Sequence, residues 1–229
     1  MIQWLRVLRA LTAKEFRLEL RGRELLTLLL CNAILMATLL GAGVSSAVLT
    51  AEQTTKVFPM LLWVVFLLSS ATSVTRFNEQ ELEGRGFEGL LLAGVSGGQM
   101  YLSKWIVLSS FLVVSFGALL FALAVSLGVD LGSVVASLLW VGIGTATALA
   151  AILVLLAAVA STSKLKGVLL PIISLPLLFP VFLCGVEMTS QLVLNGELDT
   201  LAPWPYLLLC ANTIYVVAGL NLFDAAIRE

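Results

Sequence analysis

Four carboxylates crowd one short polar stretch of this chain: Glu79, Glu81, Glu83 and Glu88. Carboxylate oxygens bind Ca²⁺ and Mg²⁺, so their spacing raises the possibility of a cation site. The stretch has no aspartate pair and no closed ligand pattern, and the whole chain contains no histidine. We therefore expect these glutamates to form a solvated face and not a metal site.

A glycine motif overlaps this stretch. Gly84-Arg-Gly-Phe-Glu-Gly89 fits the G-x-G-x-x-G pattern of dinucleotide-binding loops. That fingerprint needs a preceding strand and a following soluble helix, whereas long hydrophobic runs flank this one on both sides. The glycines are instead predicted to end a short helix and to redirect the chain before Phe87. No G-x-x-x-x-G-K-[ST] sequence is present, so this chain is not expected to hydrolyse ATP itself.

Other reactive side chains form no recognisable constellation. The absence of histidine removes the commonest haem ligand and the commonest general base. No serine is accompanied by a base that would make it a nucleophile. Cys31, Cys184 and Cys210 lie in separate hydrophobic runs without a C-x-x-C pair, which is typical of packing residues. We predict no enzyme activity, no metal and no cofactor bound by this chain.

The composition predicts an all-α integral membrane protein. Of 229 residues, 60% are apolar and 12% charged, and the mean hydropathy is +1.06. Runs of about 20 apolar residues are needed to cross the hydrocarbon core, and without period-2 alternation such runs are expected to be helices. We predict one domain over residues 25–229 with six transmembrane helices: Leu25 to Leu49, Val57 to Thr75, Trp105 to Gly128, Ser133 to Ala160, Val168 to Val186 and Trp204 to Phe223.

Residues 1–24 predict an amphipathic helix ahead of the spans. Apolar residues share one helical face, which Glu15 interrupts, and arginines share the opposite face. Such a helix suits the membrane interface, where basic side chains meet anionic headgroups. Two interpretations stay open: a simple basic anchor, or an elbow helix that helps to seat a cytoplasmic subunit. The apolar face is Trp4, Val7, Leu8, Leu11 and Leu18, and the basic face is Arg6, Arg9, Arg17 and Arg21.

The basic residues also predict the orientation. With six spans both termini lie on one side, and all 13 Lys and Arg residues except Lys56 fall on that side. Basic residues accumulate in the cytoplasm, so both termini, a 76–104 loop and a 161–167 loop are expected there. On the outer side, residues 185–203 are long for a turn and are expected to hold a short surface helix.

The fifth predicted span contains three prolines, Pro171, Pro176 and Pro180. Each removes a backbone donor and clashes with the preceding turn, so this helix is expected to be kinked or broken. Two interpretations stay open: a distortion whose freed carbonyls are satisfied by neighbouring helices, or a hinge that lets part of the bundle move.

The fourth predicted span carries a ridge of small residues, Gly142, Ala146 and Ala150. Small residues at this spacing let helix backbones approach closely. Packing inside the bundle is the favoured interpretation, over a specific dimer contact.

Three segments carry a family resemblance. They are Lys14-Glu-Phe-Arg-Leu-Glu-Leu-Arg21; Phe77, Glu79 and Gly84 followed by Phe87-Glu88-x-Leu90-Leu91-Leu92; and Lys166-Gly-Val-Leu-Leu170 followed by Leu175-Pro-Leu-x-x-Pro180. Together they resemble the haem exporter protein B family, membrane permeases of bacterial cytochrome c maturation. The chain departs from that pattern at Gly86, which looks like an insertion, at Gly94, where a proline is expected, and at Pro171.

The resemblance implies a permease subunit of an ABC-type transporter in the bacterial inner membrane. Its task would be haem export, or release of a haem-loaded chaperone, during c-type cytochrome biogenesis. A separate cytoplasmic ATPase would consume the ATP, a haem-handling membrane protein would work beside it, and haem is the possible substrate. Membrane lipids are expected as further contacts, and nucleic acid is not.

The resemblance also implies that the ATPase docks on the 76–104 loop. The apolar members of the loop would fill a groove on the ATPase, and its glutamates would orient the contact by pairing with basic residues. The expected coupling residues are Phe77, Glu79, Glu83, Gly84, Phe87, Glu88, Leu90 and Leu91. Two other functions stay open: a permease for lipid, polysaccharide or drug, and an assembly scaffold that transports nothing.

Overall fold

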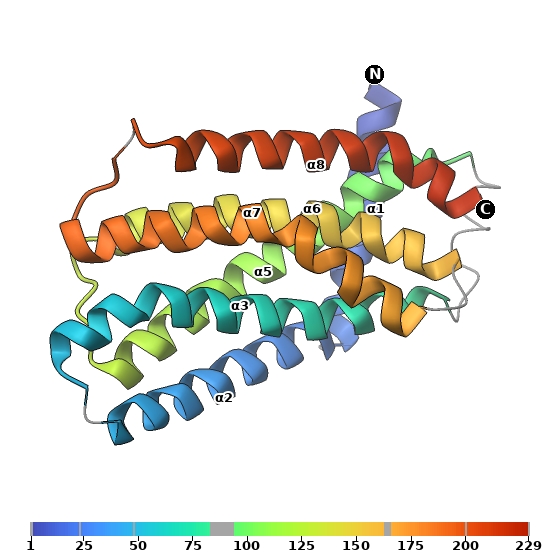
Figure 1. Cartoon of the computed structure of the whole chain (residues 1–229). Coiled ribbons are helices and arrows are strands. Elements are labelled where there is room, and N and C mark those ends of the chain that lie inside the picture. The colour runs from blue at the N-terminus through green and yellow to red at the C-terminus, as the bar shows by residue number, and fades with distance from the viewer. Residues whose placement is uncertain are drawn as a thin grey trace.

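A computed structural model describes residues 2–22, 24–47, 49–82, 94–162, 166–199 and 201–228. In these ranges all regular secondary structure is helical, as predicted (Figure 1). The helices are α1 (Ile2–Gly22), α2 (Glu24–Ser46), α3 (Ala51–Leu82), α5 (Gly97–Leu127), α6 (Val135–Thr162), α7 (Lys166–Asn195) and α8 (Pro203–Arg228).

Six of the described helices are long and apolar enough to cross a membrane, which confirms the prediction of six spans after an N-terminal helix. Several of the helix limits differ from those predicted. α5 begins at Gly97, well before Trp105, because Ser96 caps the helix there and the polar residues up to Lys104 are buried against neighbouring helices. With α3 continuing to Leu82, the connection between the two helices is confined to residues 83–96 and is shorter than the expected 76–104 loop.

The prediction of a short surface helix within residues 185–203 is wrong. α7 simply continues to Asn195, past the predicted end of its span at Val186. The reason lies in its packing: Thr189 and Leu192 are buried, and Thr189 Oγ1 accepts a hydrogen bond from Trp63 Nε1 of α3 at 2.8 Å. Tertiary contacts therefore hold these residues in the span itself.

α6 forms the centre of the bundle. In the hydrophobic stretch of α6, 83% of the residues are buried, against 22% in that of α8 and 28% in that of α2 at the periphery. The small-residue ridge lies inside the protein, since Ala146 and Ala150 are fully buried and the ring of Phe116 on α5 lies directly on Gly142. Packing within the bundle, the favoured interpretation, is confirmed.

Aromatic rings packed on glycines join neighbouring helices in three places. Trp63 of α3 lies on Gly185 of α7, Phe116 on Gly142, and Tyr101 of α5 on Gly219 of α8. A Cβ atom added at Gly185, Gly142 or Gly219 would lie 2.7, 2.2 or 2.0 Å from the nearest ring atom. Large rings thus use the close backbone approach that glycine permits, and any side chain at these glycines would push two helices apart.

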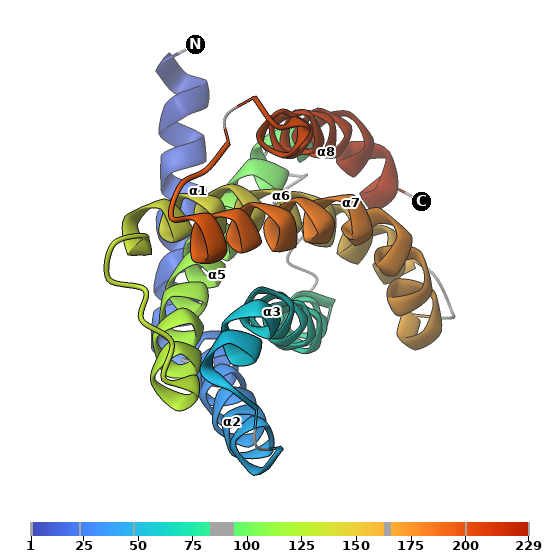
Figure 2. The same ribbon diagram turned by 60° about the vertical axis from the view of Figure 1, so that its left-hand side comes forward.

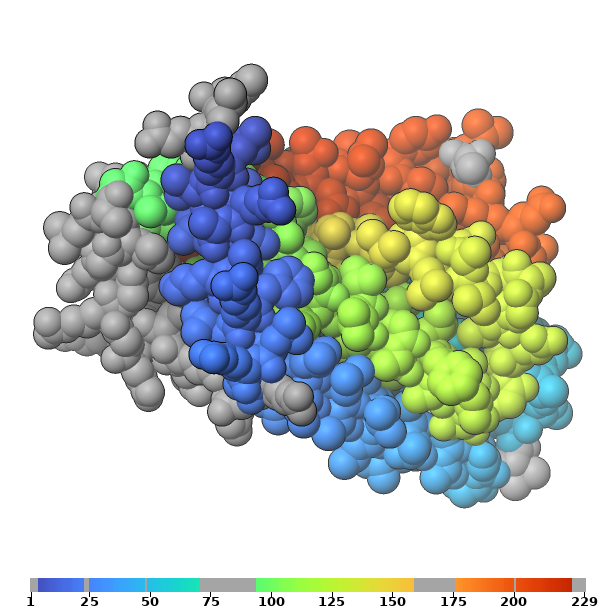
Figure 3. Space-filling view, turned by 180° about the vertical axis from the view of Figure 1, so that it is seen from behind, coloured from blue at the N-terminus to red at the C-terminus, as the bar shows by residue number. Residues whose placement is uncertain are grey.

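α1 runs across one end of the bundle, at a steep angle to the spans (Figures 1 and 2). The space-filling view from behind shows it lying over α5 on the surface (Figure 3). The C-terminal end of α8 is at the same end of the bundle, as are the last turn of α3 and the first turn of α5 (Figure 1).

α7 is not broken by its prolines. A single α-helix runs from Lys166 to Asn195 through Pro171, Pro176 and Pro180, and the ribbon bends along its length (Figures 1 and 2). Within the bend, the Leu177 carbonyl accepts a hydrogen bond from the Tyr215 hydroxyl of α8. A neighbouring helix thus donates to the backbone of α7 between Pro176 and Pro180.

Candidate coupling site at one end of the bundle

The predicted coupling residues divide into two groups. Phe77 and Glu79 lie on the last turns of α3, where the helical backbone is described. Glu83, Gly84, Phe87, Glu88, Leu90 and Leu91 lie outside the described residues, as does the G-x-G-x-x-G run. What the structure describes around them is the helix before this segment and the turn and helix after it.

The turn after this segment is built on glycine and serine. Gly94 has a φ of +77°, in the left-handed region that favours glycine. Proline, whose ring fixes φ near about −65°, cannot adopt this conformation. A proline at position 94 would therefore be incompatible with this turn into α5.

Ser96 and Gln99 begin α5 with a capping box. The Ser96 backbone N–H donates to Gln99 Oε1 at 3.1 Å, and the Gln99 backbone N–H donates to Ser96 Oγ at 3.4 Å. Two backbone donors that the helix itself cannot pair are thereby satisfied. The first turn of α5 is fixed directly where the chain leaves residues 83–93.

The same glutamine also reaches the N-terminal helix. Gln99 is only 5% exposed, and its Nε2 donates to the Trp4 carbonyl oxygen of α1 at 3.2 Å. Further along both helices, the rings of Phe16 and Phe111 pack with centroids 5.5 Å apart. We call this set, Trp4 and Phe16 with Gln99 and Phe111, the α1–α5 junction.

The side of α1 that contacts the bundle includes only part of the predicted apolar face. Leu11 is buried as expected, but Trp4 and Leu18 are 41% and 55% exposed. Glu15, which interrupts that face, and Glu19 are buried, at 6% and 7% exposure. The helix crosses the bundle obliquely, so the crossing line, and not the apolar stripe, decides which residues are covered.

The predicted basic face is exposed along its whole length: Arg6, Arg9, Arg17 and Arg21 are all accessible. Among the described residues none of these four forms an ion pair, since the ion pairs there are Lys14–Glu15 at 3.5 Å and Lys56–Glu52 at 2.6 Å. Their charges are therefore available to an anionic surface.

A second anchor holds the start of α5 to two more helices. Tyr101 is fully buried with its ring on Gly219 of α8. Its hydroxyl lies 3.1 Å from the Ala151 carbonyl of α6 and 3.3 Å from the Tyr215 carbonyl of α8, within donating distance of both. The first turns of α5 thus contact α1, α6 and α8 together.

Sequence reasoning missed Gln99 and Tyr101. The Ser96-x-x-Gln99 spacing is the capping-box pattern and would have located the start of α5. Nothing in the sequence indicates that the Gln99 amide also bonds α1, or that Tyr101 packs on Gly219, because both contacts join segments far apart in the chain.

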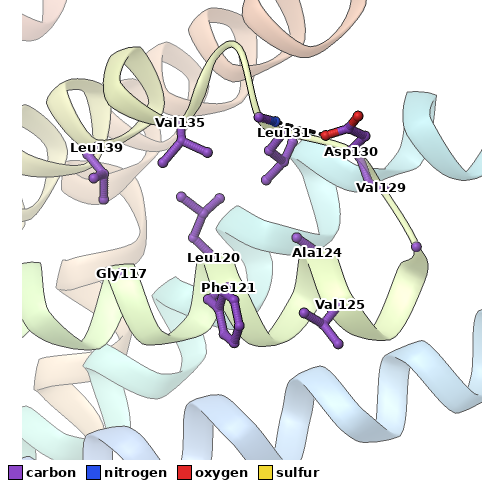
Figure 4. A pocket seen from close by; sticks show the side chains of 12 residues that line it. Gly117, Leu120, Phe121, Ala124, Val125, Val129, Asp130, Leu131, Val135 and Leu139 are labelled. Carbon is purple, nitrogen blue, oxygen red and sulfur yellow. Dashed lines mark hydrogen bonds between the residues drawn. The ribbon is translucent and has the colours of Figure 1, made fainter.

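A cavity lies at the opposite end of the bundle, between α5 and α6 (Figure 4). It has a volume of about 630 Å³ and is lined mainly by apolar side chains, among them Leu120, Phe121 and Val135, with Asp130 at its rim. The lining contains no His, Met, Tyr or Cys, so it offers no common axial ligand for haem iron. Its chemistry suits an apolar chain.

The fold defines a polytopic membrane protein: a bundle of candidate spans with a helix laid across one end. The chain belongs to the CcmB protein family, which it matches over residues 6–228. That family comprises the haem-exporter permeases of cytochrome c maturation, transport subunits and not enzymes, which pair with an ABC ATPase. A comparison with curated protein sequences found no match.

Proposed function

We propose that this chain transmits movement from a cytoplasmic ABC ATPase to its membrane helices through residues 76–96. The observation that carries the proposal is the structure on either side of residues 83–93. α3 leads into this segment as a continuous helix, and α5 leaves it through a capping box and is held by three other helices. A push on this segment would therefore be passed directly to α3 and α5.

The proposed orientation places this end of the bundle in the bacterial cytoplasm, with both termini. The charge distribution supports it: nearly all basic residues of the chain belong to this end, and the exposed arginines of α1 suit anionic headgroups at the inner leaflet. α1 would then be an elbow helix in the membrane interface. A cysteine placed at position 13 on α1 should react with a membrane-impermeant reagent only after the cytoplasmic side is opened.

Within the segment, we propose that the apolar residues insert into a groove on the ATPase and that the glutamates orient this contact. The expected docking residues are Phe77, Phe87, Leu90 and Leu91, with Glu79, Glu83 and Glu88 around them and Gly84 allowing the turn. An amphipathic element of this kind matches the helix-in-groove mode of recognition.

The docking test is co-purification. Phe87→Asp combined with Leu91→Asp should remove the ATPase from the tagged, detergent-solubilised chain, because a buried charge cannot be accommodated in an apolar groove. Leu201→Asp is the matched control, since Leu201 is an exposed apolar residue in the α7–α8 connection at the other end. Unchanged recovery of the ATPase with the double variant would refute docking on this segment.

The functional test separates transport from scaffolding. An ATPase that binds but cannot hydrolyse nucleotide should abolish formation of c-type cytochromes in cells that carry the wild-type permease. Normal cytochrome levels in that strain would indicate a scaffold. Normal levels in a strain lacking this chain would instead favour a permease for lipid, polysaccharide or drug.

The bend in α7 is the proposed moving part. The C-terminal part of the helix is held to α3 by Trp63, which lies on Gly185 and bonds Thr189, so movement would be taken up at Pro171, Pro176 and Pro180. Changing Pro176 and Pro180 together to Ala should straighten the helix and lower cytochrome formation while the ATPase still co-purifies. Unaltered cytochrome formation would leave the prolines as a packing feature only.

A further inference from the structure

We propose that Gln99 is the positioning residue that makes α1 move together with the coupling segment. The inference rests on the proposed coupling through residues 76–96. It adds that α1 is part of the moving body, fixed to the start of α5 through one side-chain amide, and is not a passive anchor in the lipid interface.

The amide of Gln99 has two functions at once. Its oxygen accepts hydrogen bonds from the Ser96 backbone N–H and hydroxyl, both at 3.1 Å, and so holds the turn that directly follows residues 83–93. Its nitrogen donates to the Trp4 carbonyl oxygen of α1 at 3.2 Å. One planar group therefore connects the end of the coupling segment with α1, and a shift of Ser96 must shift or break the contact to Trp4.

Burial gives this contact its strength. Gln99 lies among fully buried neighbours, Met100 and Tyr101, and is almost closed to water. A buried amide that loses its partner has no water to replace it, so separating α1 from α5 carries a larger free-energy cost than an exposed hydrogen bond would. The Phe16–Phe111 contact extends the same interface along both helices and resists rotation of α1 about Gln99.

The chain contains an internal control for this role. Thr50 and Gln53 form the same capping box at the start of α3: the Thr50 N–H donates to Gln53 Oε1 at 3.0 Å, and the Gln53 N–H donates to Thr50 Oγ1 at 3.3 Å. Gln53 is exposed, and within the described residues it makes no hydrogen bond to another helix. The two glutamines share the cap and differ in the connection to a second helix.

Two substitutions at each glutamine separate these functions. Gln99→Glu keeps the oxygen acceptors of the capping box and replaces the donor to Trp4 with an oxygen that repels its carbonyl. Gln99→Met removes both the side-chain acceptor of the capping box and the donor to Trp4 without adding a charge, while the bond from the residue-99 backbone N–H to Ser96 Oγ can remain. Gln53→Glu and Gln53→Met make the same changes where only a cap exists.

The experiment uses the full chain co-purified with its ATPase, and hydrogen exchange of the α1 amides as the structural readout. Both Gln99 variants should raise exchange across α1 about tenfold, the size expected for one buried hydrogen bond, while both Gln53 variants leave α1 unchanged. Cells carrying either Gln99 variant should lose most c-type cytochrome formation, although the ATPase remains bound. Cells carrying either Gln53 variant should keep it.

Two results would overturn the inference. If Gln99→Glu matched the wild type in α1 exchange and in cytochrome formation, the residue would be only a helix cap. If α1 loosened in both Gln99 variants while cytochrome formation stayed normal, α1 would not take part in coupling. Neither result bears on docking, which fails only if the Phe87→Asp and Leu91→Asp chain retains its ATPase.

Discussion

The starts of α5 and α3 are built from the same capping motif and differ in the contacts that they make with other helices. Both begin with a hydroxyl residue followed three positions later by glutamine, Ser96 with Gln99 and Thr50 with Gln53. At α3 the motif is exposed and serves its own helix. At α5 it is attached to α1 through Gln99, and Tyr101 in the next turn contacts α6 and α8.

This difference teaches that a helix cap acquires a mechanical role only through what surrounds it. The α3 start lies at the end of the bundle away from α1 (Figure 1). There the chain needs only to reverse its direction between α2 and α3. The α5 start lies at the end where the proposed ATPase contact is, and its side chains spread displacement over three helices. Matched variants at the two ends of the bundle therefore test this difference.

The largest effect is expected where Tyr101 packs on α8. Gly219→Ala would place a Cβ atom 2.0 Å from the Tyr101 ring, forcing α5 and α8 apart, and should destabilise the chain by about 2–3 kcal/mol. Gly43→Ala, at the other end, meets no atom within 4 Å and should be neutral or slightly stabilising. Thermal unfolding in detergent measures both, and equal stabilities would disprove the close packing at α5.

The Tyr101 hydroxyl should give the next effect. Tyr101→Phe keeps the ring on Gly219 and removes the buried donor to the Ala151 and Tyr215 carbonyls, which should destabilise by about 1.5 kcal/mol. The exposed Tyr206 offers a control, since Tyr206→Phe should change nothing. A chain with Tyr101→Phe that unfolds at the wild-type temperature would mean that the hydroxyl contributes no net stability.

The two caps themselves should be equally strong. Ser96→Ala and Thr50→Ala each remove one capping hydroxyl and should each destabilise by about 1 kcal/mol in the same unfolding assay. Only Ser96→Ala should also lower c-type cytochrome formation, because only that cap adjoins the proposed coupling segment. If both variants lowered it equally, the functional distinction between the two helix starts would be lost.

The smallest effect is expected at the α3 start. Lys56 and Glu52 pair at 2.6 Å on an exposed helix surface, one turn apart. Screened surface pairs add little to stability, so Lys56→Met should leave the unfolding temperature within error. A clear loss would show that the α3 start is held more firmly than its exposure indicates.

Much of the fold was predictable because the membrane imposes it. A span must be long enough to cross the hydrocarbon and must pair its own backbone groups, so the six helices follow from the hydrophobic runs. The helix over residues 1–24 was predictable for another reason, because its apolar and basic residues recur with the period of a helix. The span limits at Trp105 and Val186 were wrong, because helices extend through polar residues when caps or neighbouring helices stabilise them there.

The candidate site was predictable only in its location along the chain. Phe77 and Glu79 lie on the end of α3, and docking through any of the predicted residues stays a proposal. Gln99 and Tyr101 escaped prediction, since each looks like an ordinary residue in a helix. The side of α1 that packs on the bundle was also not predictable, because an apolar stripe does not reveal the angle at which a helix crosses its neighbours.

The sequence by itself determined the number of spans, the amphipathic N-terminal helix, the family and the uneven distribution of basic charge, because hydrophobic length, periodicity and charge are properties of contiguous residues. Only the tertiary structure decided that Glu15 and Glu19 of α1 are buried, that α7 stays one helix through its prolines, and that Gln99 bonds Trp4. These are contacts between segments far apart in the chain, and their energies depend on how the helices meet.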